Sequence, residues 1–235
     1  MVAFETATET VGVAVRTIEG LQAELSLTGR RRHVETLTPA LEHLLSQVGI
    51  EARDIGVVAV DLGPGLFTGL RVGVSAAKGL AQALGIGVIG LTSLDILTAA
   101  AASAGLGGRI LSAVDARRGE VFASLGIVDP SGAVVEQGPV QLLTPDDLAA
   151  RLSALSGEPV VAVGDGAQRY AEQLEAVPGV RCVRPALAWP PPATLLALAA
   201  ARLAQGETPV EARQIVPLYM READARSNFT QVTRS

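Results

Sequence analysis

The turn Gly63-Pro64-Gly65 is where residue types and spacing could support phosphate or nucleophile chemistry. It follows an apolar strand-like run, 57–60, and glycine amides at the start of a helix can bind phosphate. A Walker A loop has a lysine directly after its last glycine, whereas Gly69 is followed by Leu70 and Lys78 comes more than two helical turns later. A nucleophile elbow needs a serine or cysteine in the turn, and this turn has neither. Both chemistries are therefore rejected.

The other side chains that could do chemistry are few. His33 and His43 are ten residues apart, which puts them roughly 80° apart around a helix and about 15 Å along it, so they cannot share a metal ion within it. We interpret His33 as a capping or surface residue. Cys182 is the only cysteine and is expected in the core. The only lysine, Lys78, is interpreted as a solvated helix residue, with a specific role as the alternative.

The helix that follows the turn carries a side with almost no side chains. Gly65, Gly69, Gly73 and Ala77 recur every four residues and therefore share one face, and Thr68 is placed to cap the helix. A glycine inside a helix costs about 1 kcal/mol relative to alanine. We therefore expect another backbone to approach this side closely.

Composition limits the function classes. The 235 residues suit two lobes. The chain is 49% hydrophobic but only 3% aromatic, so its core must be built from alanine, valine and leucine. A net charge of −5 argues against direct binding of nucleic acid or an anionic membrane. No apolar run approaches the roughly 20 residues that span a bilayer, and the chain starts with strand-like sequence instead of a signal peptide. A cytoplasmic protein is expected.

The second half of the chain repeats the order of the first. Residues 3–11 and 113–121 each read as a strand, a polar turn and a returning strand, and Glu5 and Asp115 end the first strand of each copy. The run Val-Val-Ala-Val at 57–60 is repeated letter for letter at 160–163. This order predicts an α/β fold of two duplicated lobes, each with a mixed sheet flanked by helices.

Domain boundaries follow from this repeat. A glycine-rich segment at 105–108 is the expected joint. The N-terminal lobe is predicted to cover 1–106, completed by a helix near 193–205, and the smaller C-terminal lobe to cover 107–192. Residues 222–235 are polar enough to be predicted as a loose tail.

Several strings resemble one known family over nearly the whole chain. They are GPGLFTGLRVG at 63–73, AKGL at 77–80, VDARRGEV at 114–121 and VPLYMR at 216–221, all of which look like the bacterial TsaB (YeaZ) family. Two hairpins that each carry an acidic residue also resemble the actin-like, ribonuclease H-like ATPase superfamily. The resemblance implies two actin-like lobes.

The resemblance implies a non-catalytic subunit that requires no cofactor of its own. The related subunit TsaD transfers a threonylcarbamoyl group to adenosine 37 of tRNAs reading codons that begin with A, and it holds a metal through a His-x-x-x-His pair. In this chain the second position of that pair is Leu37, so no metal is expected. TsaE is implied as a third component, and tRNA is implied to bind only through the complex.

The resemblance also implies a cleft between the lobes. Glu5 and Asp115 stand where the superfamily places carboxylates that order magnesium-bound water, and Gly164 and Gly166 resemble its adenosine-side turn. Family members usually carry aspartate at the position of Glu5. A relict cleft without turnover is expected, with ATP or ADP possible there or at the interface of the complex. The Arg117-Arg118 pair could meet phosphate or remain exposed.

In the family, the first two helices form the face that pairs with TsaD, or with a second copy when TsaD is absent. Carried over to this chain, the predicted interface consists of Leu37, Leu41, Leu44, Gly69, Arg71, Gly73, Ala77 and Lys78. The main rival is a self-sufficient small ATPase or kinase acting through Glu5 and Asp115. A glycopeptidase has little support, because neither a metal pair nor a Ser/His/Asp arrangement can be read from the sequence.

Overall fold

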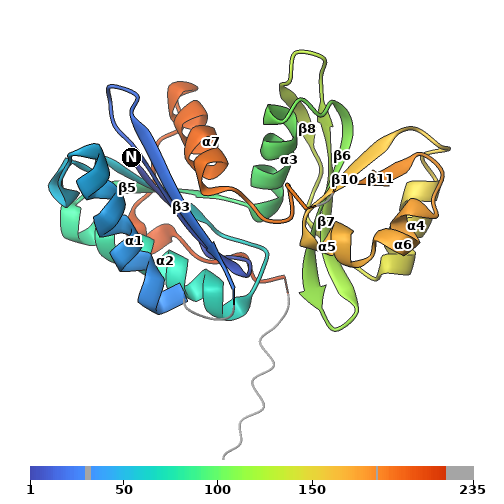
Figure 1. The fold of residues 1–235 in the computed structure, drawn as a ribbon, viewed down its shortest axis with the longest axis horizontal. Coiled ribbons are helices and arrows are strands. Elements are labelled where there is room, and N and C mark those ends of the chain that lie inside the picture. Colours follow the sequence, from blue (N-terminus) through green and yellow to red (C-terminus); the bar gives the residue numbers. More distant parts are fainter. Residues whose placement is uncertain (30–32, 184, 221–235) are drawn as a thin grey trace, which may run out of the picture.

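The computed structural model describes residues 1–29, 33–183 and 185–220, which form two lobes side by side (Figure 1). Each lobe is built on one β-sheet. Helices α3 (Ser93–Ser103) and α7 (Pro192–Ala204) lie between the two sheets. The predicted tail at 222–235 lies outside the described residues. Within the described ranges, no helix combines the length and the apolar character needed to cross a bilayer.

The first sheet has five strands in the order β3-β2-β1-β4-β5. Strands β1, β2 and β3 are antiparallel neighbours, whereas β4 and β5 run parallel to β1. The strands are β1 (Val2–Glu5), β2 (Thr10–Arg16), β3 (Gln22–Thr28), β4 (Val57–Asp61) and β5 (Gly87–Leu91). Parallel strands end at the same edge of a sheet, so Glu5 and Asp61 lie at one edge.

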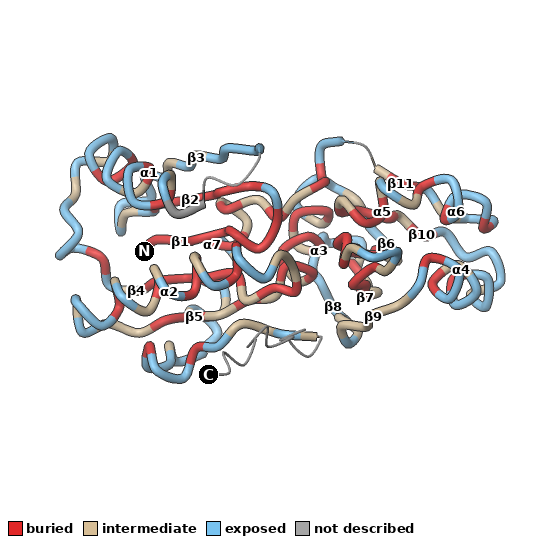
Figure 2. The backbone as a smooth tube through the Cα atoms, turned by 90° about the horizontal axis from the view of Figure 1, so that it is seen from below, coloured by how far each residue is buried: buried red, intermediate tan, exposed pale blue. Residues whose placement is uncertain are grey.

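Helices cover both faces of this sheet. Helices α1 (His33–Val48) and α2 (Phe67–Leu84) pack on one face, where Val2 and Phe4 join the core, and α7 packs on the other, where Ala3 meets Leu195. Because both faces are covered, β1 and β4 are buried almost along their whole length (Figure 2). This double burial is the physical reason for their continuous apolar sequence.

The second sheet has six strands and repeats this plan. Its main order is β11-β10-β6-β7-β8, and β9 pairs with β7. The strands are β6 (Gly108–Arg117), β7 (Glu120–Val128), β8 (Val134–Gln137), β9 (Gln141–Leu143), β10 (Val160–Val163) and β11 (Val180–Cys182). On one face α3 contributes Leu94 and Leu97 to the core. The outer face is covered by α4 (Pro145–Ser153), α5 (Asp165–Arg169) and α6 (Ala171–Glu175).

The two sheets share one topology. In each, a central strand pairs antiparallel with the next strand in sequence and parallel with a strand that follows later, β1 with β2 and β4, and β6 with β7 and β10. The predicted α/β fold of two duplicated lobes with mixed sheets flanked by helices is therefore confirmed. Helix α3 lies within the predicted span 1–106, yet it packs mainly on the second sheet while Ile96 reaches the core beneath α7.

One local prediction is wrong. Thr68 was expected to cap α2, but the cap position is Leu66 and Thr68 lies inside the first turn. The amide of Leu66 donates to the carbonyl oxygen of Ala7 at 2.6 Å, so the start of the helix is fixed by the first hairpin and not by a side-chain cap. Two short 3-10 helices, Ala52–Asp54 and Ala212–Gln214, complete the described elements.

Candidate functional site

The predicted site begins at the turn of the first hairpin, where Glu5 ends β1. Its side chain is fully buried. Oε1 accepts hydrogen bonds from the Ala7 amide at 3.0 Å and from the Thr8 hydroxyl at 3.3 Å. Oε2 is buried and has no hydrogen-bond partner among the described residues. A charged carboxylate is costly in such a setting, so the protonated form is favoured.

A second buried carboxyl group, that of Asp61, lies beside Glu5. The β1–β4 register pairs Phe4 with Val60, which brings the next residues of both strands together. Asp61 accepts hydrogen bonds from the Gly63 amide at 2.7 Å and from the Ser93 hydroxyl at 2.8 Å. Burial raises the pKa of Asp61 to about 7. Burial, and then repulsion from Asp61, raise the pKa of Glu5 well above its usual value.

Asp61 did not figure as a site residue in the sequence prediction. A signal was present, because two apolar strands that end in acidic residues would place those residues together if the strands were parallel neighbours. Without a known strand order, that pairing could not be inferred.

In the second hairpin, Asp115 is held by two arginines. Its Oδ2 lies 2.9 Å from Arg117 Nη1 and 3.2 Å from Arg169 Nη1, and its Oδ1 accepts from the Arg117 amide at 2.9 Å. The Asp115 side chain is only 3% exposed, so these contacts compensate a buried charge. Arg117 also reaches the first hairpin, where Nη2 lies 2.7 Å from Glu9 Oε1. Arg117 is therefore an ion-pairing residue and not a simple exposed charge.

The glycine turn after β10 is pressed against the second sheet. Gly164 has φ 101°, and a Cβ there would overlap the carbonyl oxygen of Ala113. A Cβ at Gly166 would lie 2.8 Å from the Val114 carbonyl carbon. Between them, Asp165 Oδ1 accepts from the Asp115 amide at 3.0 Å, and burial raises the pKa of Asp165 to about 6. Close packing within the lobe thus accounts for both glycines.

The two predicted cleft carboxyl groups are therefore engaged in different ways. The pKa of Glu5 is raised beside Asp61, and the charge of Asp115 is balanced by Arg117 and Arg169. Ordering magnesium-bound water requires ionised carboxylates that are free to accept hydrogen bonds. In this arrangement the residues do not fit a magnesium nucleotide.

The small side of α2 is covered by the protein's own first hairpin. A Cβ at Gly73 would overlap Thr6 Oγ1, and that hydroxyl donates to the Gly69 carbonyl at 2.8 Å. Ala77 is also buried. The expectation of a closely approaching backbone is confirmed at Gly65, where a Cβ would overlap the Ala7 carbonyl. The prediction that Gly69, Gly73 and Ala77 offer a free surface to a partner is wrong, because Thr6 of the hairpin covers Gly69 and Gly73, and Ala77 is buried in the core.

The leucines of α1 are likewise used inside the lobe. Leu37 and Leu44 are buried in the core beneath α1, and Leu41 is partly buried against it. Their predicted place on a partner surface is wrong for the two buried residues, since the sheet already covers them. Lys78 donates to the Ile215 carbonyl at 3.2 Å, so it anchors the C-terminal segment and is not an ordinary solvated lysine.

One predicted interface residue, Arg71, belongs to an exposed cluster. Its guanidinium carbon lies 3.8 Å from the ring centroid of Phe67, and Nε donates to the Tyr219 hydroxyl at 3.2 Å. The Phe67 and Tyr219 ring centroids are 5.3 Å apart. Phe67 and Tyr219 remain 44% and 46% exposed. We call these three residues the Arg71 cluster.

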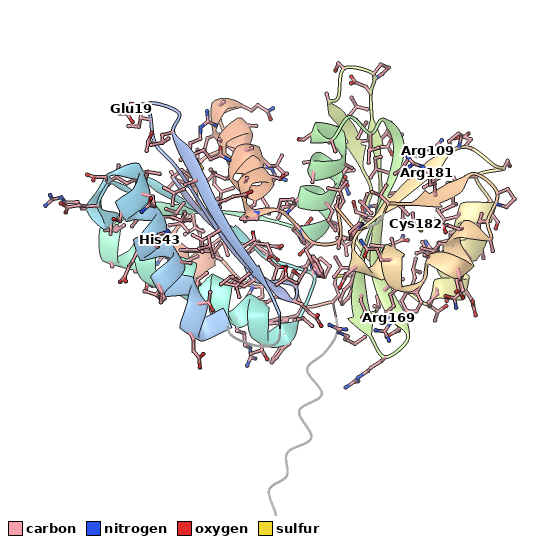
Figure 3. All side chains as sticks on the ribbon, viewed as in Figure 1. Glu19, His43, Arg109, Arg169, Arg181 and Cys182 are labelled. Atoms are coloured by element: carbon pink, nitrogen blue, oxygen red, sulfur yellow. The ribbon has the colours of Figure 1, made fainter. Side chains whose placement is uncertain are left out.

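The histidines and the cysteine are separate from these sites. His33 begins α1, but its side chain lies outside the described residues, whereas His43 is exposed on α1 (Figure 3). Cys182 is buried on β11 in the other lobe, as predicted. Across the described ranges, no group of three or more histidine, cysteine, aspartate or glutamate side chains could hold a metal ion.

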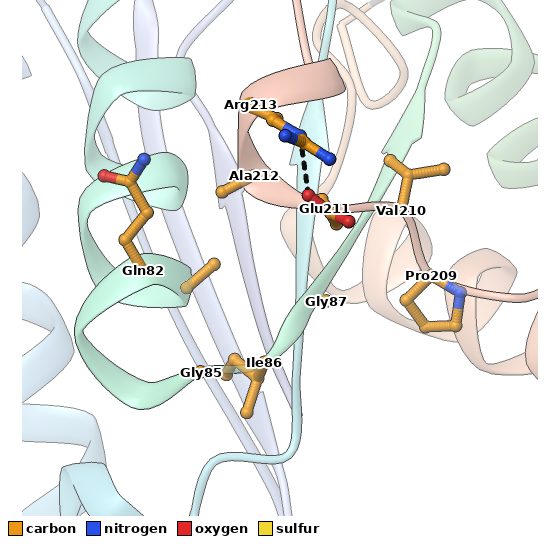
Figure 4. A pocket seen from close by; sticks show the side chains of 10 residues that line it. Gln82, Gly85, Ile86, Gly87, Pro209, Val210, Glu211, Ala212 and Arg213 are labelled. Carbon is orange, nitrogen blue, oxygen red and sulfur yellow. Dashed lines mark ion pairs between the residues drawn. The ribbon is translucent and has the colours of Figure 1, made fainter.

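An open pocket of about 460 Å³ lies between the end of α2 and residues 209–213 (Figure 4). Gly85 and Gly87 line it, and a close ion pair joins Arg213 to Glu211 beside it. Gly87 begins β5, whereas Glu5 ends the parallel strand β1. The pocket is therefore at the opposite end of the sheet from the carboxyl groups and does not belong to the predicted cleft.

Comparisons with known proteins agree with this geometry. The family model described as TsaD, tRNA N6-adenosine threonylcarbamoyltransferase, matches residues 27–229. The tRNA threonylcarbamoyladenosine biosynthesis protein TsaB of Escherichia coli K12 is 31% identical over 221 residues, covering 94% of each chain. The TsaB protein of Bacillus subtilis 168 is 29% identical over 98% of each chain.

Solved structures give the same assignment. The structure titled "YeaZ from Pseudomonas aeruginosa" has a TM-score of 0.80 and 29% sequence identity, with 93% of this chain and 98% of that chain covered. The similarity thus extends over most of both lobes. On these grounds the chain belongs to the TsaB (YeaZ) family.

Proposed function

We propose that this chain is a non-catalytic subunit of the machinery that makes threonylcarbamoyladenosine at position 37 of tRNA. In this role it binds and activates the catalytic subunit TsaD, together with TsaE. The names of the E. coli and B. subtilis relatives support a place in this biosynthesis. The net charge of −5 supports a role in which tRNA is contacted through the complex.

The state of the hairpin carboxyl groups is the observation that carries the non-catalytic role. Glu5 is buried beside Asp61, and Asp115 is paired with two arginines. Neither is placed to act on a magnesium nucleotide, so the chain requires no cofactor for its role. Any ATP or ADP of the complex is proposed to lie at its cleft or at the interface between subunits without turnover by this chain.

The surface proposed to receive TsaD is the outer side of α1 and α2 around the Arg71 cluster. Tyrosine and arginine are enriched among the residues that dominate the binding energy of protein interfaces, and phenylalanine is enriched at interfaces in general. Here Arg71 stacks on the Phe67 ring and donates a hydrogen bond to the Tyr219 hydroxyl, and both of these aromatic residues are about half exposed. The surface therefore has a preformed centre, whereas Gly69 and Gly73 act from inside by fixing α2 to the first hairpin.

The direct test is reconstitution of the modification. TsaD, TsaE, unmodified tRNA and the pathway substrates are incubated with and without this chain, and threonylcarbamoyladenosine is measured by mass spectrometry of the digested tRNA. We expect product only when the chain is present. Equal product in both reactions would overturn the proposal.

The rival function is that of a self-sufficient ATPase or kinase. The one observation in its favour is that Glu5 and Asp115 have matching positions in the two hairpins: Glu5 ends β1, and Asp115 lies near the end of β6. Purified chain is assayed for ATP turnover beside an Asp115→Asn variant. Equal rates exclude the rival, and a rate that falls in the variant excludes the non-catalytic role.

A further inference from the structure

The pocket at the end of α2 has no part in the proposed function. Residues 209–213, which are joined to β5 at Val210, form the wall opposite the last turn of the helix (Figure 4). The inner side of the pocket is apolar, because Ala81 and Ala212 are buried there and Ile86 lies beside them. A ligand that fits this pocket therefore carries an apolar group.

Arg213 gives the outer side of the pocket its polar character. Its Nε lies 2.6 Å from Glu211 Oε2, and Glu211 also caps the 3-10 helix Ala212–Gln214. This ion pair orients the guanidinium, whereas its two Nη groups bond to nothing in the described part of the chain. The Arg213 side chain is 76% exposed, so these donors are accessible. Paired N–H donors of an arginine match the two oxygens of a carboxylate.

The charges around the pocket also favour an anion. Glu211 is the one carboxylate among the described lining residues, and Arg213 already balances it. Lys78 adds a second positive charge. It comes four residues before Gln82 and therefore lies on the same face of α2, where its Nζ donates to the Ile215 carbonyl at 3.2 Å. The positive charges outnumber the negative one, and this attracts a carboxylate.

The pocket also offers backbone carbonyl groups that have no donor. The amides of Gly85 and Ile86 both donate to the carbonyl of Ala81 at the end of α2. No group in the described part of the chain donates to the carbonyls of Gln82 and Pro209, which belong to opposite walls of the pocket. Backbone amides of a bound polypeptide would supply the missing donors.

We propose that this pocket binds the C-terminus of a partner protein. The terminal carboxylate lies on Arg213, and the last side chain, which is apolar, lies on Ala81 and Ile86. An open site suits a polypeptide end, because a small metabolite needs a pocket that encloses most of its surface. The last residues of this chain itself, 233–235, are polar and do not match the apolar inner side. The inference does not depend on the proposed function, since the Arg71 cluster lies at the other end of α2.

Two peptides that differ only at their C-terminus test the carboxylate. The probe is fluorescein-labelled Gly-Gly-Ala-Leu-Leu with a free carboxylate, and the control is the same peptide with a C-terminal amide. Fluorescence anisotropy with the full chain should show at least about tenfold tighter binding of the acid. In NMR spectra of the labelled chain, the acid should shift the backbone amide signals of Gly85 and Gly87. Equal affinity of the two peptides, or no binding of either up to about 1 mM, would overturn the proposal.

Arg213→Gln tests where the carboxylate binds. The variant should bind the acid at least about tenfold more weakly than the parent chain and should no longer distinguish the acid from the amide. Arg53→Gln is the matched control, because Arg53 is also 76% exposed and pairs with Glu51 beside a 3-10 helix, but does not line the pocket. Circular dichroism shows whether each variant folds, and the two peptides test the parent chain in any case. An equal loss in both variants, or a preference for the acid that persists in Arg213→Gln, would contradict the proposed site.

Discussion

Arg117 and Glu9 form an ion pair between the turns of the two hairpins, with 2.7 Å between Nη2 and Oε1. The two residues belong to different lobes. Through its other amino group, Arg117 also holds the buried Asp115. A single side chain therefore connects the turn of the first hairpin to the acidic residue of the second, and it links the lobes where a relict cleft was predicted.

Replacing Arg117 tests how much its two ion pairs contribute to stability. In Arg117→Gln, Asp115 would keep Arg169 but lose its closer guanidinium, and Glu9 would lose its ion pair. Because the Arg117 side chain is 42% exposed, water compensates part of the loss, and we expect the free energy of unfolding to fall by about 1–2 kcal/mol. Urea denaturation measures it.

The matched control is Arg53→Gln, which breaks an ion pair with Glu51 in which both side chains are largely exposed. That change should be within about 0.5 kcal/mol. An equal effect of the two substitutions would mean that Arg117 is only a surface charge.

Two glycines of α2 give a second prediction. In Gly73→Ala, the added methyl group would overlap Thr6 Oγ1, which is held by its hydrogen bond to the Gly69 carbonyl. We expect a loss of about 1–3 kcal/mol in thermal or urea unfolding, because either the hairpin or α2 must shift.

In Gly79→Ala, on the same helix, the methyl group meets open space. There alanine should stabilise by up to about 1 kcal/mol through its higher helix propensity. The opposite signs of the two effects separate packing against the hairpin from helix propensity. If both substitutions changed the free energy of unfolding in the same direction, the contact of residue 73 with Thr6 would not determine the effect at that position.

The sequence was sufficient to predict the duplicated fold, because its strands differ sharply from their turns and recur in the same order. It also indicated that a neighbour lies close to the small side of α2, which is the Ala7 backbone at Gly65 and the Thr6 side chain at Gly73. It did not indicate which neighbour, since the spacing of small residues is the same whether a partner or the same chain lies there. The three-dimensional structure is needed to see that the first hairpin of the same chain lies against α2.

The carboxyl groups show the same limit. Glu5 could be selected because it ends a strand, but its burial beside Asp61 depends on β1 and β4 being parallel neighbours. Asp115 could be selected in the same way. Its pairing with Arg169 joins residues 54 positions apart, and no local pattern predicts that contact.

The buried pair predicts how stability depends on pH. The pKa of Asp61 is raised to about 7 in the folded protein, and that of Glu5 is raised as well, whereas both are near 4 when unfolded. Between about pH 4 and pH 7 the folded protein therefore binds more protons, and the free energy of unfolding should fall as the pH rises. For one proton the slope is about 1.4 kcal/mol per pH unit.

Two variants check the origin of this slope. Asp61→Asn and Glu5→Gln remove one titrating group each, so urea denaturation between pH 4 and 7 should give a shallower slope for both than for the parent chain. Asp165, whose pKa is raised to about 6, contributes in the same range, so part of the slope should persist. A slope unchanged in both variants would contradict the assignment.

The Arg71 cluster gives the last prediction, which concerns the affinity for TsaD. Arg71→Ala removes both the stacking on Phe67 and the hydrogen bond to Tyr219, so the centre of the proposed surface loses its order. We expect Kd for TsaD to rise at least about tenfold in isothermal titration calorimetry. Arg53→Ala, another exposed arginine of the same lobe, should leave Kd unchanged. If Arg71→Ala binds TsaD as tightly as the parent chain, the proposed surface is wrong. A loss of affinity in Arg53→Ala instead would show that TsaD docks elsewhere.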